Sequence, residues 1–177
     1  MPDKAISHWL DANRNIRSEA FYEAHLQDVQ LADDEYAFKL GYYCHLVADQ
    51  VWLDKVWRPK KVTPLYAEPL AKDADFVYEI KRDWYGLDFL YLRAYPQSLF
   101  YTDFVPIKRV PDYVEGVFPV GAFTQRVHET RAFYLGGPDW TLDRPYRYLS
   151  QAEWDAYVQL ALHRLQAALA DKGVLQI

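Results

Sequence analysis

The chain has 177 residues, of which 51% are hydrophobic and 25% are charged. This length and composition are ordinary for one globular domain and argue against long disordered segments. The formal net charge of −5 argues against nonspecific binding to duplex nucleic acid, and the longest stretch without a charged residue, 116–125, is too short to span a membrane.

The single cysteine, Cys44, excludes an internal disulfide framework and a cysteine-rich zinc site. The first residues lack the apolar stretch of a secretory signal peptide. We therefore expect a cytoplasmic protein without a transmembrane segment. Aromatic residues make up 17% of the chain, which predicts an aromatic-rich core, and the oligomeric state stays open.

Helices are the expected elements of the first half of the chain. A helix is expected over residues 19–29, with Ser18 as its N-cap. A long apolar helix follows over residues 35–57, and Pro59 is expected to end it. Residues 58–69 contain three prolines and predict a loop.

The second half also shows helical spacing of its apolar residues. Residues 72–95 predict a helix that ends before Pro96, and residues 118–135 predict another that stops at the glycines of residues 136–138. The last helix opens on a capping box at residues 150–153. These elements predict an all-α chain of five to six helices.

We expect these helices to form one domain over residues 1–177. No repeat or composition shift marks a boundary within the chain, and no element requires a strand.

The expected helix over residues 35–57 carries the most informative pair of polar residues. His45 and Asp49 are four residues apart, so they share one face, and Gly41 lies one turn earlier. The helix is apolar nearly all round, which predicts a buried position, and a glycine on this face would let another helix approach. A buried imidazole and a buried carboxylate are costly unless they are paired or coordinated.

Two interpretations of this pair stay open. In the first, His45 and Asp49 form a structural hydrogen-bonded pair that locks helices together. In the second, they bind zinc or another divalent metal, because neutral imidazole and carboxylate suit such ions and helical bundles bring inward-facing ligands together.

Residues 41–52 contain the pattern Gly-Tyr-x-x-His-Leu-x-x-Asp, which resembles the central helix of the zinc-dependent phospholipase C family. That family belongs to an all-helical superfamily with the single-strand-specific zinc nucleases. Ser7-His8-Trp9 resembles the Thr-His-Phe element upstream of that helix, and residues 78–88 resemble an acidic aromatic helix that follows it.

The resemblance implies an all-α fold and metal-assisted hydrolysis of a small phosphoester or a lipid. It implies metal-ligand roles for His8, His45 and Asp49. Asp83 would serve as a fourth ligand or as the catalytic base that orients a water molecule. Tyrosines such as Tyr42 and Tyr78 would support these ligands through hydrogen bonds.

Some features of the family have no counterpart in this sequence. The relatives carry an N-terminal histidine helix and a further aspartate before the quoted elements. Where they place a histidine soon after the aspartate, this chain has Asp54 and Lys55, and neither His128 nor His163 is followed by glutamate four residues later. We therefore expect one or two metals, or a degenerate site. The alternative function is a non-catalytic helical binding or assembly protein that keeps a structural His–Asp pair.

Overall fold

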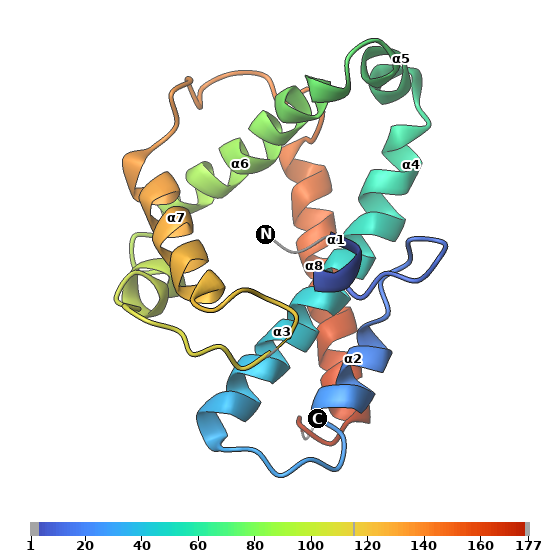
Figure 1. The fold of residues 1–177 in the computed structure, drawn as a ribbon. Helices are drawn as coiled ribbons and strands as arrows, with labels where there is room; N and C mark the ends of the chain where they lie inside the picture. The colour runs from blue at the N-terminus through green and yellow to red at the C-terminus, as the bar shows by residue number, and fades with distance from the viewer. Residues whose placement is uncertain (1–3, 115, 176–177) are drawn as a thin grey trace. The chain divides into compact units, whose positions relative to one another are not determined.

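A computed structural model describes residues 4–114 and 116–175. Within them every regular element is helical, which confirms the predicted all-α class (Figure 1). Two π-helical segments, η1 and η3, and one 3₁₀ segment, η2, accompany the α-helices, and the β structure of these residues is limited to an isolated bridge between Leu10 and Ile16. The helical segments are α1 (Lys4–Ser7), α2 (Ser18–His25), α3 (Asp33–Trp52), η1 (Leu53–Trp57), α4 (Arg58–Lys61), α5 (Pro64–Lys72), η2 (Ala74–Phe76), α6 (Val77–Ala94), η3 (Phe100–Phe104), α7 (Ala122–Gly136) and α8 (Gln151–Asp171).

The helix count exceeds the predicted five to six because α1 and α4 are single turns of four residues each. Apart from α5, the longer helices of the described residues are those that the apolar spacing predicted. In the described part of the chain, no helix has both the length and the apolar character that a membrane-spanning segment requires.

The chain forms two compact units. The first comprises Met1–Lys60, Tyr113–Pro119 and Asp155–Ile177, and the second comprises Lys61–Asp112 and Val120–Trp154. Each unit contains its own buried aromatic and aliphatic side chains. The single domain expected from the sequence stays a prediction.

The core of the first unit is built where α3 packs against α2. The rings of Tyr22 and Tyr43 meet edge to face, with centroids 5.1 Å apart. Phe21 and Leu46 are fully buried beside them, and Leu169 of α8 packs against the same cluster. In Figure 1, α2, α3 and the C-terminal part of α8 lie side by side. Burial of these side chains supplies the main stabilisation of the unit.

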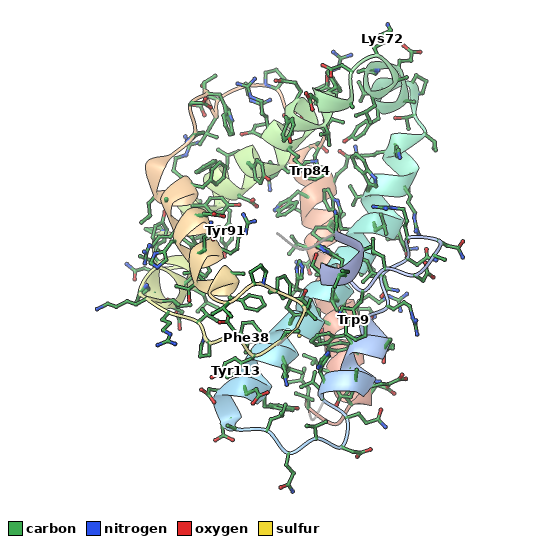
Figure 2. All side chains as sticks on the ribbon, in the orientation of Figure 1. Trp9, Phe38, Lys72, Trp84, Tyr91 and Tyr113 are labelled. Carbon is green, nitrogen blue, oxygen red and sulfur yellow. The ribbon has the colours of Figure 1, made fainter. Side chains whose placement is uncertain are left out.

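Aromatic contacts also hold Tyr113 and Phe118 of the first unit against α3. Phe38 and Tyr113, labelled in Figure 2, have ring centroids 5.5 Å apart. The hydroxyl of Tyr113 also donates a hydrogen bond to Asp34 near the start of α3.

The prediction that Pro59 ends the long helix is wrong. The backbone widens into the π-helical turn η1, in which the Arg58 N–H donates to the Leu53 carbonyl, and α4 then continues to Lys61. A proline in a regular α-helix clashes with the carbonyl four residues earlier. The wider π-turn changes the carbonyl positions ahead of Pro59, and this accommodates the ring.

Two further local predictions from the sequence are wrong. Residues 58–69 are helical over much of their length, in α4 and α5. Pro64 occupies the start of α5, where its missing N–H has no intrahelical partner to lose, and Pro69 lies inside that helix. Ser18 lies inside α2 and does not cap it, because its hydroxyl donates to Gln50 Oε1 at 3.2 Å.

In the second unit, α6 and α7 pack through aromatic rings. Phe89 of α6 contacts Phe133 and Tyr134 of α7, with centroids 5.3 Å apart in both pairs. The predicted capping box at the start of α8 is confirmed: the Ser150 N–H donates to the Glu153 carboxylate at 2.9 Å, and the Glu153 N–H donates to Ser150 Oγ at 3.3 Å.

A carboxylate lies in this aromatic contact and makes the second unit sensitive to pH. Asp88 accepts a hydrogen bond of 2.7 Å from the Tyr134 hydroxyl. Burial raises the pKa of Asp88 from 3.8 to about 6, although the Tyr134 hydrogen bond opposes this shift. The folded protein therefore binds this proton more tightly than the unfolded chain. Stability should fall as the pH rises from about 4 to about 6, and the penalty is fully present above that range.

We expect Asp88→Asn to raise the free energy of unfolding at pH 8 by about 1–2 kcal/mol, because the variant removes a buried charge while keeping an acceptor for Tyr134. The gain should shrink toward pH 4, where Asp88 is protonated. Urea unfolding at several pH values measures both effects. A gain that is the same at pH 4 and pH 8 would contradict the assignment.

Candidate metal centre

The structure brings together three of the four metal ligands that the sequence suggested. His8 follows α1, and His45 and Asp49 lie one turn apart on α3. Each offers one ligand atom, and these atoms all lie within 4.8 Å of one another. The cluster lies entirely within the first unit.

The distances between these side chains match coordination better than direct hydrogen bonding. His8 Nε2 lies 3.4 Å and His45 Nε2 lies 3.7 Å from Asp49 Oδ2. Hydrogen bonds from nitrogen to oxygen are about 2.7–3.2 Å long. A tetrahedral ion with bonds of about 2.0–2.1 Å holds its ligands about 3.3–3.4 Å apart. The His8–Asp49 separation equals the edge of such a tetrahedron, the His45–Asp49 separation is slightly longer, and all three ligand atoms lie within 4.8 Å of one another.

Hydrogen bonds around the other nitrogen of His8 leave Nε2 free to act as a ligand. Ser7 Oγ lies 3.0 Å from His8 Nδ1, and the same hydroxyl donates to the Lys4 carbonyl at 3.5 Å. In the tautomer in which Nδ1–H donates to Ser7 Oγ, the lone pair of the imidazole lies on Nε2, which faces Asp49. Metal-binding histidines commonly have their second nitrogen held in this way.

Tyr42 connects the segment that carries His8 to α3. Its hydroxyl donates a hydrogen bond to the Ser7 carbonyl, and its ring lies 6.0 Å from the His45 ring. Burial, together with the nearby charge of Asp49, raises the pKa of Tyr42 to about 12. The hydroxyl therefore stays protonated and remains a donor at neutral pH.

Burial favours the neutral form of the His8 imidazole over its protonated form. Burial lowers the pKa of the His8 imidazole, and the positive charge of Lys4 and the proximity of His45 act in the same direction, while Asp49 opposes them. A neutral imidazole is the form that binds a metal ion.

The cluster is open to solvent, contrary to the prediction of a fully buried helix. The exposed fractions of the side chains are 23% for His8, 34% for Asp49 and 50% for His45. Gly41 is exposed as well, and a Cβ added there would meet nothing within 4 Å. The glycine therefore does not admit a second helix, and it keeps side chains away from the open face. The buried face of α3 is the other one, which carries Tyr43 and Leu46.

Asp83, the fourth predicted ligand, lies in the second unit with protein partners on both oxygens. Its side chain is 1% exposed, and Oδ1 accepts a hydrogen bond of 2.6 Å from Arg144. Oδ2 accepts the backbone N–H groups of Tyr148 and Leu149. These contacts favour a structural role, and the catalytic or ligand role of Asp83 stays a prediction.

Sequence reasoning missed Ser7 as a functional residue. The hydroxyl that orients His8 comes from the residue immediately before it, and the pattern Ser7-His8 was the available signal. Of the two tyrosines expected to support the ligands, Tyr42 lies beside the cluster, whereas Tyr78 is exposed on α6 in the second unit.

No protein-family model, curated protein or solved structure matches this chain. The resemblance to the zinc-dependent phospholipase C family therefore rests on the motifs quoted from the sequence. The candidate metal centre stands on its own geometry.

Proposed function

We propose that this protein is a metal-dependent hydrolase acting on small phosphoesters, with zinc or a similar divalent ion held by His8, His45 and Asp49. The observation that carries the proposal is the spacing of the three ligand atoms on an accessible face of α3. Two imidazoles and one carboxylate form a ligand set typical of catalytic zinc, which keeps a fourth position for water or substrate.

A divalent ion in such a site lowers the pKa of bound water and neutralises charge on a phosphoryl oxygen. The protein's own contribution is to fix the ligands. Ser7 orients the His8 ring, Tyr42 holds the Ser7 backbone against α3, and the helix sets the spacing of His45 and Asp49. This arrangement supports a rigid site with an open side.

The nearby positive charge favours an anionic substrate. Lys4 is exposed and lies close enough to act on His8 electrostatically. Its ammonium group is suited to attract a phosphoryl oxygen toward the open side of the cluster. The exposed positions around Gly41 and His45 leave room for a substrate on this face.

The test is metal content and hydrolysis measured on the purified full chain. We expect about one zinc ion per chain after equilibration with zinc and gel filtration, and cleavage of p-nitrophenyl phosphate or its diester by the loaded protein. His45→Ala should lose both. His163→Ala is the matched control, because His163 is exposed on α8 and lies outside the cluster.

Each result bears on a different part of the proposal. Absence of bound metal from the unaltered chain would refute the metal centre. Metal bound in stoichiometric amount without cleavage of either ester would favour the non-catalytic binding or assembly protein.

A further inference from the structure

A groove of about 300 Å³ lies in the first unit, on a different face of α3 from the metal cluster. Its apolar lining includes Val47 and Val51 of α3 and Leu160 of α8. Since successive residues of an α-helix are about 100° apart, Val47 and Val51 project roughly 120–160° away from His45. The groove is therefore a separate feature from the candidate metal centre.

The acidic residues of the groove are already neutralised. Glu19 forms an ion pair of 2.7 Å with Lys172, and it also accepts a hydrogen bond of 2.8 Å from the Tyr43 hydroxyl. Asp54 is paired with Arg58. Neither Lys172 nor Arg58 lines the groove. Both carboxylates thus have cations of their own outside it.

The basic residues of the groove are in the opposite situation. Lys55 and Arg164 line it, and neither has an acidic partner among residues 4–114 and 116–175. The groove is therefore bordered by two cations without an ion pair and by two carboxylates whose ion pairs are with residues outside it. Such a pair of cations is suited to a ligand that carries two negative charges.

The local backbone and a fixed amide add donors to this arrangement. Lys55 lies in the π-turn η1, and π-turns inside helices are frequent at functional sites. Gln50 also lines the groove, and its Oε1 accepts the hydroxyl proton of buried Ser18. The Nε2 group of Gln50 has no acceptor within the described part of the chain, so its N–H groups are available to a ligand.

We propose that this groove binds a phosphate monoester dianion. Lys55 and Arg164 pair with the phosphate, Gln50 donates to it, and Val47, Val51 and Leu160 of the lining contact the organic group. Arginine matches the oxygens of a phosphate with two parallel hydrogen bonds, and lysine supplies a point charge. A monocarboxylate would leave one of the two cations uncompensated. The proposal does not depend on the function proposed for the metal cluster.

The test is calorimetric titration with phenyl phosphate in the presence of EDTA, using the full chain. We expect one saturable site, with affinity lowered at least about tenfold by Lys55→Met and by Arg164→Met. Lys55→Arg keeps the charge and should retain binding. Lys108→Met should leave the affinity unchanged, because Lys108 is exposed, lies in the second unit and does not line the groove.

Several results would overturn the proposal. These are no saturable binding of phenyl phosphate, binding that Lys55→Met and Arg164→Met both retain, and binding that Lys108→Met weakens. Equal affinity for benzoate would reject the dianion in favour of a simple anion site. Unfolding midpoints of the variants, compared with that of the unaltered chain, show whether a lost affinity reflects a lost fold.

Discussion

Asp83→Asn is expected to destabilise the protein by about 3–5 kcal/mol, a large part of the stability of a typical domain. The substitution leaves the Arg144 guanidinium beside a neutral group. It also replaces one acceptor oxygen of the side chain with an N–H donor. The side chain can then no longer accept hydrogen bonds from all of Arg144, Tyr148 and Leu149. Because Asp83 is 1% exposed, water cannot replace the lost partner. Denaturant unfolding measures the change.

Glu79→Gln provides the control on the same helix. Glu79 pairs with Arg82 at 3.2 Å, but both side chains are largely exposed, so the substitution should change stability by less than about 1 kcal/mol. A similarly small effect of Asp83→Asn would contradict the structural role. A loss of bound zinc at unchanged stability would instead restore the metal-ligand role that the sequence suggested.

Asp49→Asn is expected to lower zinc affinity by more than about 100-fold. Loss of a residue that merely supports a ligand costs about 10–100-fold, and Asp49 is the only carboxylate of the described cluster. Stability without metal should hardly change, because the carboxylate is 34% exposed and lies 3.4 and 3.7 Å from the two imidazoles.

Thermal melts with and without zinc measure the effect of Asp49→Asn on zinc binding separately from its effect on stability. Zinc at 100 times its dissociation constant stabilises a native protein by about 2.7 kcal/mol, which corresponds to roughly 5–10 °C for a chain of this size. We expect that shift in the unaltered chain and its loss in Asp49→Asn, together with any esterase activity. A variant that still shows the full shift would contradict the role of Asp49.

Local patterns predicted much of the secondary structure. The capping box before α8 and the glycines at the end of α7 act through neighbouring residues, so the sequence alone locates these helix ends. Pro59 is different, because a π-turn several residues long accommodates it. The prediction that Ser18 caps α2 failed because its hydroxyl bonds to Gln50, which is distant in the sequence, and not to its own helix.

In the candidate site too, features set by neighbouring residues could be predicted, and features set by residues distant in the sequence could not. The spacing of His45 and Asp49 predicts a shared face of α3, and the structure has that geometry. Which face is buried depends on packing by α2 and α8, so the exposure of His45 could not be read from an apolar helix. The partners of Asp83 are about sixty residues away in the sequence, so nothing near it distinguishes a structural carboxylate from a ligand.

The Tyr42–Ser7 hydrogen bond joins residues 35 positions apart, and a metal ion shared by His8 and α3 would close nearly the same loop. The entropy of closing that loop is then lost once, on folding, and not again when the ion arrives. The Tyr42 hydroxyl thereby holds the segment that carries His8 near α3 before the ion binds. The first unit should gain resistance to unfolding from the ion, while the second unit, whose described residues contribute no ligand to the cluster, should respond to chelators far less.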